Sequence, residues 1–272
     1  MQIAIGLKYG SKLTANLSPS RFVPFAEPIL AADVPVVFQN PFSEQPHPLC
    51  IIAADLLKIH LIGQTEWVHN FGLKEGQEGT VIGKMFGVLV ARSEEGILGY
   101  LAGYSGKLAG GYHQSAFVPP VFDGLTEGSF LNMGMSELSR INQQIAMLEE
   151  TNLSIYQLEI AQLKSTRKQN SIRIQDEIFN NYQFLNRDGN QKNMRDIFLD
   201  WNGTKPPSGA GECAGPRLLH YAYQHKLLPL ALAEFWWGLS PKSDTWQHER
   251  YYLPCREKCE PILHFMLEGV ED

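Results

Sequence analysis

Two stretches near the C-terminus of this 272-residue chain carry its clearest pattern: residues 208–237 read SGAGECAGPRLLHYAYQHKLLPLALAEFWW, and residues 253–261 read LPCREKCEP. Apolar residues recur at helical spacing over 213–225, and an almost continuous apolar run follows over 230–237. We expect a helix, a buried strand and a last helix that starts at residue 254 or 255 and ends at 267. That order predicts a right-handed crossover and therefore an α/β layer structure with a mixed sheet.

Three of the four cysteines lie in these stretches, at Cys213, Cys255 and Cys259. Because Cys255 and Cys259 are four residues apart in a segment predicted to be helical, their thiols would project from one helix face. Cys213 and Cys255 stand at the predicted starts of helices, where the macrodipole and free amides favour the thiolate form. A zinc ion that activates water has three protein ligands and one open position, so these cysteines are candidate zinc ligands. The alternative is that they are core residues without a metal.

Two carboxylates near the cysteines are candidate catalytic residues. Glu212 directly precedes Cys213, and Glu234 interrupts the apolar run of the predicted strand. A carboxylate among apolar residues must be paired, protonated or functional, unless it faces solvent at an edge. Either glutamate could move protons beside a zinc site.

Upstream of these stretches the chain divides by composition. Residues 1–133 read as a proline-rich arm, a helix from Pro48, and a β-hairpin with strands over 84–91 and 97–104. Residues 134–186 read as a helical insertion, and residues 187–272 complete the same α/β core.

The predicted insertion is polar and almost free of glycine and proline, with apolar residues spaced by three and four. The step of five from Leu148 to Leu153 marks either a stutter in one long, coiled-coil-like helix or the turn of a helical hairpin. Lys164, Arg167, Lys168 and Arg173 form a basic cluster near its end. This cluster is either a solvated face or an RNA contact, and the insertion is also a candidate surface for a protein partner.

Composition limits the classes of partner. The net charge of −6 gives no overall attraction to nucleic acid or to an anionic membrane, so any RNA contact must be local. The N-terminus lacks the basic start and apolar run of a signal peptide, and no apolar stretch approaches the length of a membrane span. We expect a cytoplasmic protein with reduced cysteines and no membrane partner.

Six strings are spread over nearly the whole chain: PHPLC at 46–50, SGKLAG at 105–110, FVPPVFD at 117–123, PPSGAGECA at 206–214, AEFWWG at 233–238 and CREKCEPIL at 255–263. Together they resemble the long N-terminal region of a subgroup of bacterial RluA-type pseudouridine synthases. In that family a downstream domain isomerises uridine with an aspartate in an Arg-Leu-Asp setting, and no Arg-Leu-Asp occurs in this sequence. The resemblance implies an accessory, RNA-modification-associated domain, with tRNA or rRNA as partner and the isomerase activity elsewhere.

The order of elements has a second, more distant resemblance, to the zinc-dependent nucleobase deaminases and related bacterial toxins. It implies a deaminase-like α/β core with the helical segment inserted. Those enzymes place a zinc ligand two residues before a catalytic glutamate and a Pro-Cys-X-X-Cys pair on a later helix. Gly215 stands at the position of that glutamate, so Glu212 or Glu234 would have to replace it, and the later cysteines are separated by three residues rather than two. A zinc-dependent deaminase-like enzyme and a non-catalytic interaction module are therefore the alternative functions.

Overall fold

The computed structural model describes residues 21–269 apart from 125, 127 and 152. The strands are β1 (Val23–Pro24), β2 (Lys84–Arg92), β3 (Leu98–Tyr104), β4 (Gln183–Leu185), β5 (Gln191–Asn193), β6 (Leu228–Trp237) and β7 (Tyr251–Tyr252). The helices are η1 (Ala31–Asp33), α1 (Pro48–Gly63), α2 (Phe130–Glu150), η2 (Ser154–Tyr156), α3 (Gln157–Asn181), α4 (Met194–Asn202), α5 (Ala214–Gln224) and α6 (Glu260–Met266), where η marks a 3-10 turn. The helix from Pro48, the β-hairpin of β2 and β3, the helix that follows Cys213 and the apolar strand β6 are confirmed.

The main sheet has five strands in the order β1-β3-β2-β6-β7, and every neighbouring pair is antiparallel. The predicted mixed sheet with a right-handed crossover is therefore wrong, although the chain does combine helices with a sheet in an α/β arrangement. The crossover rule applies to two parallel strands joined through a helix. Here β6 pairs with β2, from far upstream, and with the two-residue β7, so α5 and α6 join no parallel pair.

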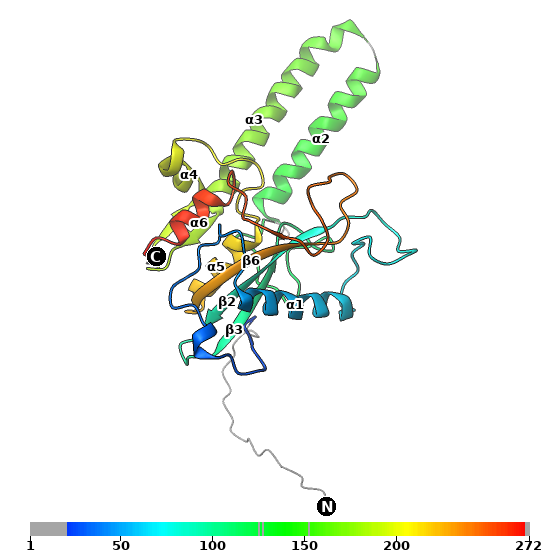
Figure 1. Ribbon diagram of the computed structural model, residues 1–272. Helices are drawn as coiled ribbons and strands as arrows, with labels where there is room; N and C mark the ends of the chain where they lie inside the picture. The colour runs from blue at the N-terminus through cyan, green and yellow to red at the C-terminus, as the bar shows by residue number, and fades with distance from the viewer. Residues whose placement is uncertain (1–20, 125, 127, 152, 270–272) are drawn as a thin grey trace, which may run out of the picture.

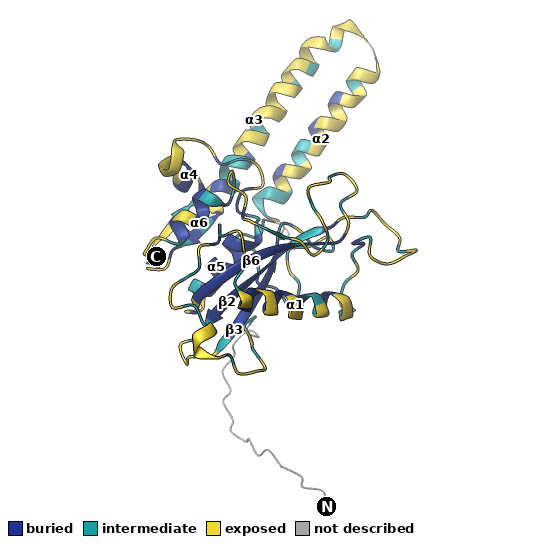
Figure 2. Ribbon diagram, in the orientation of Figure 1, coloured by how far each residue is buried: buried dark blue, intermediate teal, exposed yellow. Residues whose placement is uncertain are grey.

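Helices cover both faces of this sheet, with α5 on one face and α1 on the other (Figure 1). The side chains of β2 contribute to the hydrophobic layers on both faces of the sheet, because successive side chains of a strand point to opposite faces. Leu89 and Ala91 belong to the hydrophobic cluster around α5, whereas Val88 and Val90 belong to the cluster around α1. The central strands are buried along nearly their whole length (Figure 2).

The predicted insertion is a helical hairpin, formed by α2 and α3, that projects from the body (Figure 1). Of the two interpretations of the step between Leu148 and Leu153, the turn is correct, because α2 ends at Glu150 and α3 begins at Gln157. Ser129 caps α2 by accepting a hydrogen bond from the Asn132 backbone amide. Most of the hairpin surface is exposed (Figure 2). Within the described residues, no helix is long and apolar enough to cross a membrane.

The last helix is shorter than predicted and does not contain Cys255. Residues 256–259 form a turn, Cys259 is the N-cap residue, and α6 begins at Glu260. Pro261 accounts for the difference. In a helix that started at residue 254 or 255 its ring would clash with the preceding turn and a hydrogen bond would be lost, whereas proline fits the first turn of a helix.

Candidate metal centre

The N-terminus of α5 positions the first candidate ligand. Cys213 is the N-cap residue of α5, as predicted, with extended backbone. Two side chains bind the backbone amides that a helix leaves free at this end. Ser105 Oγ accepts a hydrogen bond from the Ala214 amide at 3.2 Å, and Glu234 Oε1 accepts one from the Gly215 amide at 2.9 Å. Contacts from the residue that follows β3 and from the interior of β6 therefore fix the backbone beside Cys213.

The other two candidate ligands meet across a turn rather than along a helix. The Cys259 amide donates to the Cys255 carbonyl at 3.0 Å, which closes the turn between them. The two sulfur atoms are 3.3 Å apart. The predicted proximity of the two thiols is confirmed, but the predicted reason, a shared helix face, is wrong.

The sulfur atoms of Cys213, Cys255 and Cys259 all lie within 4.8 Å of one another, close enough to bind one metal ion. A tetrahedral zinc with Zn–S bonds of about 2.3 Å places its sulfur ligands about 3.8 Å apart. The Cys255–Cys259 separation is about 0.5 Å shorter than this value and no separation exceeds 4.8 Å, so the donor set fits zinc in number and type and comes within about 1 Å of its spacing. Cys259 is buried and Cys255 is exposed, so the cluster reaches from the core to the surface.

Mutual hydrogen bonding sets the protonation of the three thiols. Hydrogen bonding with Cys213 and Cys259 lowers the pKa of Cys255 well below its usual value. The hydrogen bond with Cys255, together with burial, raises the pKa of Cys213. Hydrogen bonds with Cys213 and Cys255, together with burial, raise the pKa of Cys259. The metal-free cluster thus favours one thiolate held by two thiols. A metal ion bound by all three sulfurs would release the remaining protons, because thiolates are the ligands.

Glu234 lies on β6 beneath the start of α5. Its side chain is buried, and burial raises its pKa to about 7, against the opposing effect of the hydrogen bond from Gly215. The charge of Cys255 contributes to the same rise, and Glu234 in turn raises the pKa of Cys213 and of Cys259. The edge position facing solvent is thereby excluded for Glu234. The structure brings this carboxylate and the three cysteines into one electrostatic unit.

Glu212 makes a different set of contacts. Its carboxylate accepts a hydrogen bond from the Tyr112 hydroxyl at 3.2 Å, and its carbonyl accepts one from the Gly106 amide at 2.9 Å. Burial lowers the pKa of the neighbouring Lys84, and Glu212 opposes that shift. Of the two predicted carboxylates, Glu234 therefore belongs with the cysteines, and Glu212 belongs with a tyrosine and a lysine.

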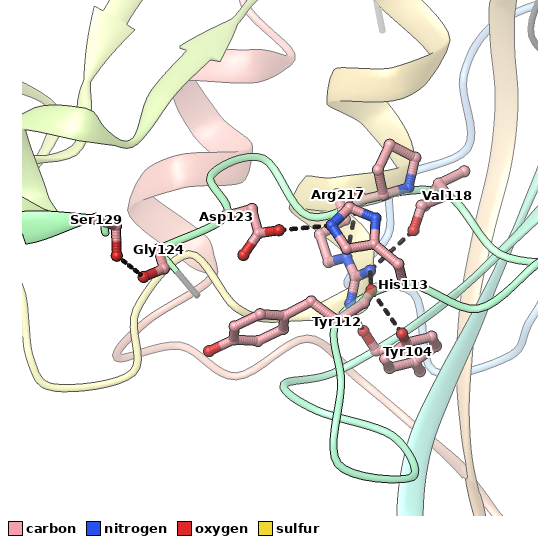
Figure 3. Close-up of polar contacts among 9 residues, drawn as sticks. Tyr104, Tyr112, His113, Val118, Asp123, Gly124, Ser129 and Arg217 are labelled. Atoms are coloured by element: carbon pink, nitrogen blue, oxygen red, sulfur yellow. Dashed lines mark hydrogen bonds and ion pairs between the residues drawn. The ribbon is translucent and has the colours of Figure 1, made fainter. Parts of the chain in front are cut away.

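Arg217, which the sequence analysis did not single out, anchors α5 to the segment that follows β3. The residue is 2 % exposed, and its guanidinium donates to the carbonyls of Tyr104 at 2.6 Å and Val118 at 2.8 Å (Figure 3). It also lies over the Tyr104 ring, 4.5 Å from the centroid. The sequence held a signal for this role, because an arginine among the apolar residues of 214–222 must find partners when the helix is buried. Ser105 carried no such signal, since its contact depends on tertiary structure alone.

A small cavity lies beside Glu234. It has a volume of about 60 Å³ and is lined by Glu234, by β7 and by residues of the 41–46 and 253–254 segments. Small-molecule sites typically have volumes of about 300–1,000 Å³. This cavity can hold water next to the carboxylate but is too small for a nucleobase.

Comparison of the chain with protein-family models, with curated protein sequences and with solved structures found no match in any of the three. The argument for function therefore depends on the residues of the site.

Proposed function

We propose that this chain is a zinc protein with a deaminase-like site, in which Cys213, Cys255 and Cys259 hold one zinc ion and Glu234 transfers protons. The observation that carries the proposal is the approach of three sulfur atoms to within 4.8 Å beside a buried carboxylate. A zinc ion with three protein ligands keeps one position open and supplies Lewis-acid activation of water or substrate. The exposure of Cys255 supports access to that position from solvent.

The role of Glu234 rests on where its carboxylate lies. In the deaminases that the chain resembles, the catalytic glutamate stands two residues after the first ligand, where this chain has Gly215. A Cβ atom added to Gly215 would lie 3.7 Å from Glu234 Oε1. This proximity supports the proposal that the carboxylate on β6 takes the role of the glutamate that a deaminase carries on its helix. With a pKa of about 7, this carboxyl group can both accept and donate a proton near neutral pH.

The substrate class is proposed from the resemblance, and the cavity limits it. The cavity of about 60 Å³ beside Glu234 includes none of the three cysteines in its lining, and a nucleobase could enter it only if the 41–46 segment or the 253–254 segment moved. Deamination of cytosine and adenine, free and in single-stranded RNA, is the assay for this part of the proposal. Activity that Glu234→Gln abolishes without loss of zinc would support it.

Metal content is the first experiment. Purified untagged protein should contain about one zinc per chain, and Cys213→Ala and Cys255→Ala should lose most of it. Cys50→Ala is the matched control, because Cys50 is buried in the hydrophobic cluster around α1 and is absent from the group of three. Zinc-free wild-type protein, or equal zinc content in all four proteins, would refute the proposal.

A second proposal follows the resemblance to the RluA-type enzymes: an accessory domain associated with RNA modification. It is supported by Lys164, Arg167 and Lys168, which are exposed on the projecting hairpin. Lys164 is partly neutralised by Glu149 at 2.8 Å, so we expect a weak, local RNA contact. Changing all three residues to glutamine should weaken binding of tRNA or rRNA fragments and reduce the salt dependence of the affinity.

The control for this second proposal is Lys74→Gln, an exposed lysine outside the hairpin. RNA binding that is unchanged in the triple variant, or lost equally in the control, would remove the hairpin from any RNA interface. In that case a protein partner becomes the remaining proposal for the hairpin, supported by exposed apolar residues near its tip. These residues are Met147, Leu153, Ile155 and Leu158.

A further inference from the structure

A second, larger cavity lies where α4 and α6 meet the 38–42 segment. Its volume is about 470 Å³, which falls within the range of small-molecule sites. Trp201 at the end of α4 contributes one wall, and Glu260, His264 and Glu268, spaced by four along the chain from the start of α6, contribute another. The cavity does not include the three cysteines or Glu234.

Aromatic rings line much of this cavity. Phe38 and Phe42 face it from the N-terminal segment, where both also pack against the hydrophobic cluster around α5. Trp201 is 41 % exposed, so a large apolar surface of this side chain is left in contact with water. The His264 ring lies against Trp201, with 4.9 Å between ring centroids. These rings present π-faces or edges to whatever enters the cavity.

The charges at the cavity are of one sign. Glu260 and Glu268 line it, and none of the described lining residues is a lysine or an arginine. Glu260 has a distant partner in Arg256 at 3.6 Å, which is itself largely exposed. Within the described part of the chain, Glu268 forms no ion pair, so its carboxylate is available to a ligand.

We propose that this cavity binds an organic cation, an ammonium or guanidinium group that enters between Trp201, Phe38 and Phe42 and is neutralised by Glu268 and Glu260. Aromatic faces attract cations through the ring quadrupole, and the carboxylates add direct charge pairing. An anion would be repelled by both glutamates. A neutral apolar ligand would cover the carboxylates without replacing their hydration, which disfavours it.

The test uses a matched pair of ligands with the full chain. N-acetyl-arginine amide carries the guanidinium, and N-acetyl-citrulline amide has nearly the same shape without the charge. Calorimetric titration should detect the arginine ligand and show much weaker binding of the citrulline ligand, with an affinity that falls as salt rises. A peptide with one central arginine, titrated in parallel, separates the sources. Tighter binding of the peptide assigns the cation to a protein side chain, and equal binding assigns it to a free metabolite.

Two variants test the walls of the cavity. Trp201→Leu should weaken binding of the arginine ligand by about 2- to 30-fold, the range expected for loss of a cation–π contact. Glu268→Gln should weaken it by about 5-fold or less and reduce its salt dependence, and because Glu268 is exposed this variant should fold normally. Glu159→Gln, an exposed change on α3, is the control and should bind as the wild type does.

Equal affinity for the arginine and citrulline ligands would overturn the proposal. So would unchanged affinity in both Trp201→Leu and Glu268→Gln, or absence of binding at concentrations on the order of 10 mM. Zinc content plays no part in these readouts, so the outcome is independent of the proposed zinc function.

Discussion

The sheet body and the projecting hairpin are built from the same chain but differ in what holds each residue in place. Residues Phe86 to Ala91 of β2 are all buried, whereas in the 21-residue α2 only Gly134, Ile141 and Ile145 are buried. In the body, burial fixes side chains and shifts their chemistry, as the raised pKa of Glu234 shows. In the hairpin, charged groups form exposed ion pairs that keep ordinary hydration. Reactive groups are therefore expected in the body, and the hairpin is expected to offer surface.

Replacement of Arg217 should give the largest loss of stability among the variants that compare the body with the hairpin. Replacing it with alanine leaves the carbonyls of Tyr104 and Val118 without a donor and opens a cavity under α5. We expect a loss of about 5 kcal/mol in the free energy of unfolding, measured by urea denaturation. Arg140→Ala on α2 is the matched change in the hairpin, where the side chain is exposed and pairs only with Glu137. A similar loss of stability in both variants would show that burial does not distinguish the two regions.

A matched pair of apolar truncations, one in the body and one in the hairpin, should also differ in their loss of stability, by slightly less than the two arginine variants do. Phe86 is fully buried and touches the rings of Phe71, Tyr104 and Phe235, so Phe86→Ala should cost about 3–5 kcal/mol. Leu158 on α3 is 71 % exposed, and Leu158→Ala should change stability by about 0.5 kcal/mol or less. Melting temperature and urea midpoint measure both. A large effect at Leu158 would indicate that the hairpin is covered in solution, as in an oligomer.

The pH dependence of stability tests the burial of Glu234. Its pKa is raised from 4.5 to about 7 in the folded state, so the protonated form is favoured by folding. Stability from this group is present below pH 4.5 and is lost as pH rises through about 7, by about 3 kcal/mol in all. The lowered pKa values of Cys255 and His220 act in the opposite direction, so the test compares chelator-treated, reduced wild-type protein with Glu234→Gln. Between pH 5 and pH 7.5 the urea midpoint of the wild type should fall relative to that of the variant.

Glu234→Gln should lack the contribution of this group, because the amide does not titrate in this range. Glu159→Gln, an exposed change on α3, should leave it intact. An equal pH dependence in wild type and Glu234→Gln would mean that water reaches the carboxylate and that its pKa is ordinary.

The sequence predicts those helices and strands whose own residues show the periodicity of the element and the turn residues at its ends. The helix from Pro48, the hairpin of β2 and β3, and the strand β6 follow from local periodicity and turn residues, and each was found close to its predicted bounds. The pairing of β6 with β2 was not predictable, because about 140 residues separate the two strands and nothing local specifies the partner. Without that pairing the order of elements favoured a parallel crossover.

The candidate site likewise has features that the local sequence predicts and features that depend on tertiary structure. Their spacing and their places at predicted helix starts made Cys213, Cys255 and Cys259 candidate ligands of one zinc ion, with metal-free core residues as the alternative. The structure brings their sulfur atoms together. The turn that joins Cys255 to Cys259 was missed, because the effect of Pro261 on the helix start was not weighed. The choice between Glu212 and Glu234 needed tertiary structure, since only the register of β6 beneath α5 puts one carboxylate on the Gly215 amide.

A small loss of stability is predicted for a change at the contact between the two hairpin helices, where Gly134 packs against Ile174. A Cβ atom added to Gly134 of α2 would lie 2.6 Å from Ile174 Cδ1 on α3, so an alanine there requires the buried isoleucine to move. Alanine gains about 1 kcal/mol in helix propensity, and overpacking costs about 1–3 kcal/mol, so we expect Gly134→Ala to lose about 1 kcal/mol. Amide hydrogen exchange should place that loss in α2 and α3 rather than in the sheet, because the strain is confined to their seam. Ile174→Ala removes both side-chain atoms that the added methyl group would approach most closely, Cδ1 and Cγ1, so in a double-mutant cycle it should relieve most of the cost of Gly134→Ala. If Gly134→Ala instead stabilises the hairpin by its full propensity gain, the seam is loose enough to admit the methyl group, and the hairpin differs from the body even at its most buried point.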